Sequence, residues 1–174
     1  RAPAIYHPTS CSPFQRAFSG ISAMPRNVYS EIHLHLTWHT LNNAPVLVDM
    51  VESQMHRHLR HRAIQSESVI VHEINGVADH VHMVVTIPPT ILISEWIGKM
   101  KGGSSHFINH EICNRRVLDW QTGYGVVSFG TKDLPWVIDY VRRQKEHHAK
   151  GTTQERLERV DREEDEEGKP VETG

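Results

Sequence analysis

The stretch VADHVHMVVTI, residues 77–87, decides how the middle of the chain folds. Apolar and polar side chains alternate along it, and successive side chains of a strand point to opposite faces. Val81 and Met83 therefore share one face, and His80 and His82 share the other. We predict a strand with one apolar side that packs on a core and one side that carries two imidazoles.

A second strand precedes this one closely. SVIVHEI, residues 68–74, is rich in β-branched residues, and Asn75-Gly76 after it is typical of a two-residue hairpin turn. Pro88-Pro89 ends the returning strand, because proline has no backbone N–H to give to a sheet. We therefore predict an antiparallel hairpin over residues 68–87.

The flanking elements give the fold class. EIHLHLTWHT, residues 31–40, alternates like a strand, and apolar residues at helical spacing follow from Pro45. A second helix is expected from about Ile91 to Asn109, and WQTGYGVVSFG (120–130) reads as a final strand. The order strand, helix, strand, strand, helix, strand predicts an α+β, ferredoxin-like antiparallel sheet with helices on one face.

A further helix is expected at the C-terminal end of this unit. PWVIDYVRRQKEHH, residues 135–148, follows Asp133, a residue type that often caps helices. Tyr140 and Gln144 are four residues apart, so they share one helix face. Taken alone, this pair fits an ordinary amphipathic helix better than a functional site.

Length, composition and cysteine content exclude several classes of protein. The chain has 174 residues, which is the size of a single domain with short tails. No apolar run approaches the length of a membrane span. Cys11 and Cys113 are the two cysteines, too few for a disulfide scaffold or for a four-thiolate zinc site. Reduced thiols in a cytoplasmic protein are the default expectation.

Charge divides the chain into three parts. The net charge is −2, yet nine acidic and four basic side chains follow Gly151, which leaves residues 1–150 mildly basic. Residues 1–23 lack periodicity and read as a disordered leader, and we expect one domain over residues 24–150. Residues 151–174 read as an acidic tail, largely disordered, whose first part could extend a helix.

Histidines are the chemically richest residues of the basic part, since all fourteen lie before residue 149. Two neutral imidazoles on one strand face, such as those of His80 and His82, can bind one divalent cation. The signal is weak alone, because His33 and His35 have the same spacing on the first expected strand.

Four segments in a fixed order carry a more specific signal: DHVHMVV (79–85), GKMKGGSSHFIN (98–109), WQTGYGVVS (120–128) and YVRRQKEHH (140–148). Together they resemble the HUH-superfamily single-tyrosine transposases, and most of all the IS200-like group and the REP-associated tyrosine transposases. The resemblance covers roughly residues 30–150. HUH denotes His-hydrophobic-His, which here is His80-Val81-His82.

The resemblance implies a function and a site. Tyr140 corresponds to the nucleophile, and His80, His82 and Gln144 correspond to the ligands of a divalent metal ion, Mg²⁺ or Mn²⁺. It implies cleavage and rejoining of single-stranded DNA through a 5′-phosphotyrosine, with hairpin DNA as the partner. It also implies a prokaryotic cytoplasmic protein at the nucleoid. Some relatives are homodimers in which the tyrosine helix serves the partner subunit, whereas others act as monomers.

Several further residues are candidate DNA contacts. Basic and hydroxyl side chains suit phosphate oxygens, and aromatic rings either stack on unpaired bases or pack in the core. The phosphate candidates are Lys101, Ser104, Ser105, Arg142 and Arg143, and the aromatic candidates are Trp120 and Tyr124.

Two other functions stay open at this point. A transposase-derived DNA-binding regulator without catalysis would need none of the four implied site residues. A histidine-rich metal-binding protein would explain the composition but neither Tyr140 nor Gln144.

Overall fold

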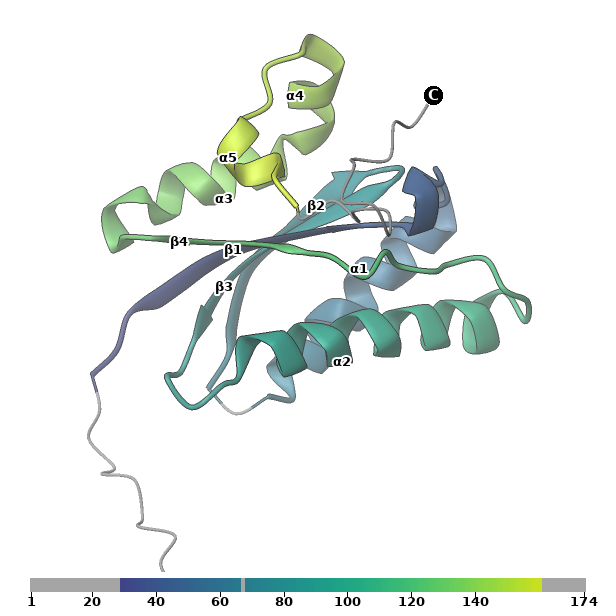
Figure 1. The fold of residues 1–174 in the computed structure, drawn as a ribbon, viewed down its shortest axis with the longest axis horizontal. Helices are drawn as coiled ribbons and strands as arrows, with labels where there is room; N and C mark the ends of the chain where they lie inside the picture. Colours follow the sequence, from purple (N-terminus) through teal and green to yellow (C-terminus); the bar gives the residue numbers. More distant parts are fainter. Residues whose placement is uncertain (1–28, 67, 161–174) are drawn as a thin grey trace, which may run out of the picture.

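The computed structural model describes residues 29–66 and 68–160, which form a four-stranded antiparallel sheet covered by helices on both faces (Figure 1). The strands are β1 (Ile32–His39), β2 (Ile70–Val77), β3 (His80–Ile87) and β4 (Gly125–Phe129), in the order β2-β3-β1-β4 across the sheet. The expected α+β, ferredoxin-like fold class is confirmed.

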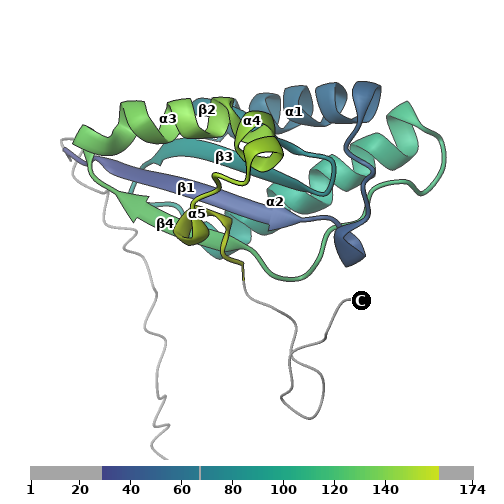
Figure 2. The same ribbon diagram turned by 90° about the horizontal axis from the view of Figure 1, so that it is seen from above.

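The helices form two layers. They are α1 (Asp49–Ile64), α2 (Ile93–His106), α3 (Leu134–Arg142), α4 (Gln144–Lys150) and α5 (Glu155–Glu158). Figure 1 shows α1 and α2 on one side of the sheet and α3, α4 and α5 on the other. Figure 2 looks onto the second side, where α5 lies over β1 and β4 while α3 and α4 lie toward β2. Within the described ranges, no helix is both long and apolar enough to cross a membrane.

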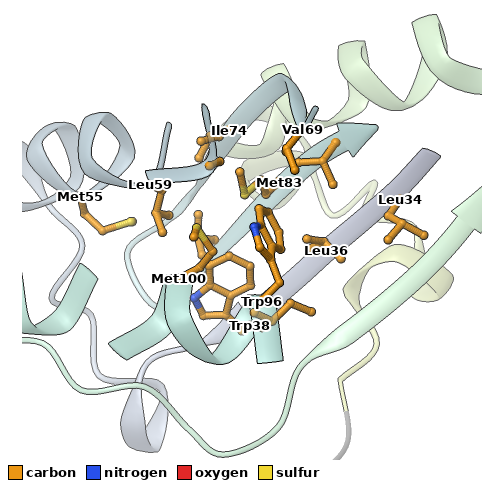
Figure 3. Close-up of a cluster of buried hydrophobic side chains, with 14 of the residues drawn as sticks. Leu34, Leu36, Trp38, Met55, Leu59, Val69, Ile74, Met83, Trp96 and Met100 are labelled. Carbon is orange, nitrogen blue, oxygen red and sulfur yellow. The ribbon is translucent and has the colours of Figure 1, made fainter. Parts of the chain in front are cut away.

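The main hydrophobic core lies between the sheet and α1 and α2. Alternate side chains of β1 and β3 point into it and meet apolar side chains from both helices, as Figure 3 shows. The members labelled there include Leu34, Leu36, Trp38, Met83, Met55, Leu59, Trp96 and Met100. The opposite face of the sheet carries a second, smaller apolar cluster, formed by Val84, Val137, Tyr140, Val141 and Leu157.

The turn of the central hairpin differs from the expectation. Asn75-Gly76 does not form it: β2 continues to Val77, which pairs with His80, so the turn is made by the two residues between them. Asn75 instead donates through Nδ2 to the backbone carbonyl of Arg142, at 2.7 Å. At Gly76 a Cβ atom would lie 2.2 Å from the backbone oxygen of His80, so close approach of backbone explains this glycine.

The expected helices have different ends. The first begins at Asp49 rather than at Pro45, and residues 41–43 form a short 3-10 turn before it. The second runs through Gly102-Gly103 without a break and continues as a π-helical turn, Phe107–Ile112. Asp133 precedes α3 but makes no side-chain capping bond.

The helix expected over residues 135–148 is divided. It breaks at Arg143, where the backbone leaves helical geometry at φ −101° and ψ 22°, so that α3 and α4 are separate elements. Arg143 lies between Tyr140 and Gln144, the two residues expected on one helix face.

The start of the acidic tail is packed, in contrast to the expectation of a disordered tail from residue 151. Leu157 on α5 is buried in the smaller apolar cluster, at 5% exposed. Gly125 on β4 makes room for this segment, because a Cβ there would lie 2.2 Å from the backbone oxygen of Arg159. The buried side chain of Leu157 thus anchors the charged segment. The expected leader and residues 161–174 lie outside the described residues.

The contact at Gly76 gives a test of the hairpin register. We expect Gly76→Ala to lower the free energy of unfolding by about 2 kcal/mol, because the clash is with backbone atoms that have no room to move. Gly98→Ala is the control: it lies in α2 with nothing within 4 Å of its Cβ position, and should stabilise by up to about 1 kcal/mol. Urea unfolding followed by circular dichroism measures both, and equal effects would contradict the register.

Candidate active site and metal centre

His80 and His82 lie on the face of β3 that α3, α4 and α5 cover. Both side chains are buried, at 3% and 0% exposed. Their rings pack edge to face with centroids 4.9 Å apart, as neighbours at i and i+2 on one strand face should. The sheet therefore presents two imidazoles toward the C-terminal helices, as the sequence predicted.

A neighbouring side chain contacts Nδ1 of each of these two rings. His80 donates through Nδ1 to the carboxylate of Asp79 at 2.7 Å. The Nδ1 atom of His82 lies 2.9 Å from Nε2 of His35 on β1. Partners of this kind fix the tautomer and the orientation of a metal-binding histidine. With Nδ1 engaged in both rings, the Nε2 atoms are the ones directed into the site.

Tyr140 and Gln144 face these imidazoles from above the sheet. Gln144 is fully buried, Tyr140 is 3% exposed, and its ring is stacked against His147 with centroids 4.7 Å apart. The hydroxyl of Tyr140 accepts a hydrogen bond from the backbone N–H of Gln154 at 2.9 Å. The break at Arg143 therefore leaves Tyr140 and Gln144 in one site, although the helix they were expected to share is interrupted.

Glu158, on α5, contacts both the histidines of β3 and the pair Tyr140 and Gln144 on the helices. Its Oε1 accepts hydrogen bonds from the hydroxyl of Tyr140 and, at 3.2 Å, from Nε2 of Gln144. Its Oε2 lies 3.2 Å from Nε2 of His82 and 3.5 Å from Nε2 of His80. The same Oε2 lies 3.5 Å from Nε2 of His148 on α4. One carboxylate thus contacts three imidazoles, a phenol and an amide.

Sequence reasoning missed Glu158 because it lies in a segment that looks like a charged tail. The available signal was the apolar residue Leu157 beside it, because a solvated acidic run has no need of a large apolar side chain.

Burial and contact with Glu158 set the pKa values in this centre. Burial lowers the pKa of His82 to about 4, against the attraction of Glu158. For His80 burial acts in the same direction, but the carboxylates of Asp79 and Glu158 outweigh it and raise the pKa to about 9. Burial would raise the pKa of Glu158, yet its contacts with His80 and His82 hold it well below the usual range. At neutral pH, Glu158 is therefore ionised.

The nucleophile candidate is held in its protonated form. Burial, together with the hydrogen bond to Glu158, raises the pKa of Tyr140 to about 12. A phenol is a weak nucleophile while it keeps its proton. Tyr140 is thus positioned but not activated while residues 154–158 contact it.

The donor atoms fit a divalent cation. His80 Nε2, His82 Nε2 and Gln144 Oε1 are all buried; the two nitrogens contact the carboxylate of Glu158, and Gln144 Oε1 has no hydrogen-bond partner. Buried polar atoms without a partner are costly and call for an explanation, and a cation is one. One ligand atom each from His80, His82, His148 and Glu158 lies within 4.8 Å of the others. Imidazole nitrogen and carboxylate oxygen are both common ligands of divalent metals.

His33 and His35 on β1, which have the same sequence spacing as His80 and His82, lie in different surroundings. His35 is fully buried and contacts His82, so it supports the site from the neighbouring strand. His33 lies near the end of the sheet, where its nitrogens bond to Thr86 at 2.7 Å and Thr131 at 3.1 Å. His33 is therefore not part of the site.

Three of the candidate DNA contacts are used inside the protein instead. The Nζ atom of Lys101 donates to the backbone oxygens of residues 121, 122 and 123, at 2.6, 3.0 and 2.9 Å. Ser104 is fully buried and accepts a hydrogen bond at 3.0 Å from Nε1 of Trp120, whose ring packs on Trp38. These side chains fasten the segment before β4 to α2, so their polar groups are engaged within the protein.

The other four candidates lie nearer the surface. Ser105 bonds to the backbone of its own helix, and Tyr124 is half-buried beside Lys101. Arg142 and Arg143 are exposed and pair with Glu73 and Asp139. Arg142 is the last residue of α3 and Arg143 follows it, so these two arginines are the candidates closest in sequence to Tyr140.

Comparison with known proteins gives a family match. The chain matches the family model described as "Transposase IS200 like" over residues 28–144, more than half of its length. Transposases for insertion sequence element IS200 from Salmonella typhimurium (strain LT2) and Salmonella typhi are each 31% identical to it over 90 residues. These matches cover 49% of this chain and 59% of each relative, so the chain spans less than two thirds of their length.

Two solved structures share the fold. A candidate transposase from Deinococcus radiodurans R1 superposes with a TM-score of 0.55 at 22% identity, over 69% of this chain and 95% of that one. A REP-associated tyrosine transposase bound to a REP hairpin superposes with a TM-score of 0.52 at 18% identity, over 74% of each chain.

The contact between His35 and His82 generates a prediction about metal binding. We expect His35→Ala to weaken Mn²⁺ binding about tenfold or more, because His82 loses the partner that fixes its ring. His33→Ala should leave the affinity unchanged. Isothermal titration calorimetry of the two variants measures this, and a loss of equal size in both would show that His35 has no specific role.

Proposed function

The chain belongs to the IS200-like transposase family, and we propose that it cleaves and rejoins single-stranded DNA with Tyr140 as the nucleophile. The observation that carries the proposal is the meeting of a tyrosine hydroxyl and two imidazole Nε2 atoms on one anionic group, the carboxylate of Glu158. A site that gathers these groups around an anion is suited to a backbone phosphate.

The proposed reaction is a transesterification. The hydroxyl of Tyr140 gives up its proton and attacks a backbone phosphorus, and the bond from phosphorus to the 3′ oxygen of the preceding nucleotide breaks. The products are a 5′-phosphotyrosine and, after that oxygen takes up a proton, a free 3′-OH. Attack of a 3′-OH on the phosphotyrosine forms a new phosphodiester and returns the tyrosine. The covalent intermediate conserves the bond energy, so no nucleotide cofactor is required.

His80, His82 and Gln144 are the proposed ligands of a divalent ion, Mg²⁺ or Mn²⁺. Two observations support this assignment: Gln144 Oε1 is buried without a hydrogen-bond partner, and the buried Nε2 atoms of the two histidines meet at one carboxylate. When bound, the ion supplies positive charge that polarises the scissile phosphate. Asp79 and His35 orient the two rings, which is a task for the protein whatever the ion.

The nucleophile has to be released before it can react. Its hydroxyl contacts Glu158 and the backbone of Gln154, and its pKa of about 12 disfavours loss of the proton. We propose that the phosphate of the substrate takes the place of the Glu158 carboxylate at Tyr140. Residues 154–158 must then shift when DNA binds.

Hairpin-bearing single-stranded DNA is the proposed partner. The solved REP-associated relative is bound to a REP hairpin, and the similar fold makes this substrate class the first to test. Arg142 and Arg143 are exposed beside the tyrosine helix and are proposed to contact phosphates, with Ser105 and Tyr124 as further candidates.

The arrangement within one chain favours action in cis. Tyr140 and His82 belong to the same chain and contact the same carboxylate. The site needs no tyrosine from a second subunit, although a homodimer that exchanges tyrosine helices is the other arrangement proposed for this family. A monomeric active species would agree with the cis site.

One prediction of the proposed function concerns the nucleophile. We expect Tyr140→Phe to reduce formation of the covalent DNA adduct at least about 1,000-fold and to change DNA affinity little, because the ring still packs on His147. Incubation with labelled hairpin oligonucleotides and a divalent metal, followed by denaturing electrophoresis, detects the adduct. Tyr124→Phe is the matched control, and adduct formation by the Tyr140 variant would assign the nucleophile elsewhere.

Another prediction of the proposed function concerns whether the DNA is single-stranded or duplex. We expect single strands to be cut and the uniform duplex to be resistant, because a stiff duplex has to be bent or opened to reach a hydroxyl fixed on a helix, at a cost of several kcal/mol. One sequence is offered as top strand, bottom strand and annealed duplex. Equal cutting of the duplex would point instead to a duplex nuclease.

A further inference from the structure

We infer that His148 and Glu158 are additional ligands of the cation that His80 and His82 bind in the DNA-free protein. This makes the segment that follows α4 part of the metal centre. The inference rests on the proposed function in one respect only, namely that His80 and His82 bind a divalent ion.

The distances in the centre fit shared coordination. The Oε2 atom of Glu158 lies 3.2, 3.5 and 3.5 Å from the Nε2 atoms of His82, His80 and His148. Two ligands of one ion with bonds of about 2.1 Å are separated by roughly 3.0–3.4 Å at octahedral or tetrahedral angles. The three contacts therefore have the separations of neighbouring ligands. The widest ligand pair is within 4.8 Å, so the centre has to contract slightly around the ion.

The orientation of the rings supports the same ligand set. His80 and His82 have Nδ1 engaged with other groups, and their buried Nε2 atoms are directed to the carboxylate of Glu158. His148 directs Nε2 to the same carboxylate oxygen, with its ring centroid 4.8 Å from that of His80. Three imidazoles and one carboxylate are a donor set that divalent transition metals favour.

Glu158 is positioned by packing and by hydrogen bonds around it. Leu157, the preceding residue, is buried against the sheet, and Gly125 lets the backbone of the following residue approach β4. Gln144 holds Oε1 of Glu158 through Nε2 and keeps its own Oε1 without a partner, so Gln144 remains available as a further ligand. A carboxylate fixed in this way loses little conformational freedom when a cation binds.

Metal binding and docking of residues 152–159 should therefore be coupled. A ligand that contacts Glu158 only in the docked state stabilises that state, and the docked state in turn raises the affinity for the ligand. The segment carries Arg156 and Arg159, both exposed, so trypsin reports on its docking.

The test is a titration of the full chain with Mn²⁺ alone, without DNA. We expect Glu158→Gln to weaken the affinity about tenfold or more, since the shape is kept and the charged ligand is lost, and His148→Ala to weaken it as well. Glu155→Gln is the matched control: Glu155 is exposed on the same short helix and should bind Mn²⁺ like the unmodified chain. Glu158→Asp, which keeps the charge but shortens the side chain, should fall between the two.

Trypsin digestion gives an independent readout. We expect Mn²⁺ to slow cleavage after Arg156 and Arg159 in the unmodified chain and in Glu155→Gln, and to have no such effect in Glu158→Gln. Mn²⁺ affinity of Glu158→Gln equal to that of the control would overturn the inference. Tighter binding would also overturn it, because it would mean that the carboxylate competes with the cation.

His80→Ala separates this inference from the proposed function. Suppose that His80→Ala loses Mn²⁺ binding while Glu158→Gln and Glu155→Gln both retain it. The assignment of His80 and His82 as ligands is then supported, and the assignment of His148 and Glu158 as additional ligands is wrong. If His80→Ala binds Mn²⁺ like the unmodified chain, the metal site of the proposed function is wrong, and the inference about His148 and Glu158 is wrong as well.

Discussion

The alternation of side chains along β3 is the constraint on which the rest of the structure depends. Val81, Met83 and Val85 point into the main core, which fixes the register of the strand against α1 and α2. His80 and His82 must then point to the opposite face. A shift of the strand by one residue would bury the imidazoles in the core and place apolar side chains in the site. Stability and chemistry are thus set by one register.

The layer above the histidines is held by far less apolar surface than the main core. Its cluster consists of Val84 and a few side chains from α3 and α5, whereas the main core draws on three strands and two long helices. Glu158 adds polar contacts: it joins this layer to β3 through His80 and His82, and it links α5 to α3 and α4 through Tyr140 and Gln144. Elements with few apolar contacts open at lower free energy than core elements, and the proposed function requires such an opening to admit a DNA strand.

The sequence was sufficient for the four strands and the fold class. Period-two alternation identified β1 and β3 and placed His80 and His82 on one strand face. The structure brings Tyr140 and Gln144 to the same place, but across a helix break that their spacing did not predict, so the choice of these two residues rested on the family resemblance. The turn predicted at Asn75-Gly76 was wrong, because glycine also occurs where two backbone segments approach closely, as Gly76 and His80 do here. The break at Arg143 has no sequence signal of the usual kind, since neither glycine nor proline is present there.

Long-range contacts account for what the sequence did not reveal. Lys101 and Ser104 looked like phosphate contacts because their partners, the carbonyls at 121–123 and the indole of Trp120, lie far away in sequence. Glu158 looked like one more tail carboxylate for the same reason. Its partners on β3, α3 and α4 are brought together only by the folded sheet.

Mapping of the DNA-linked residue by mass spectrometry tests the central claim most directly. After reaction with a single-stranded hairpin oligonucleotide and Mn²⁺, nuclease and trypsin digestion should leave a nucleotide on the peptide DLPWVIDYVR, residues 133–142. Fragmentation should place a 5′-phosphate on Tyr140. A nucleotide on the peptide of residues 117–132, which contains Tyr124, or a cleaved strand with no covalent peptide, would contradict the account.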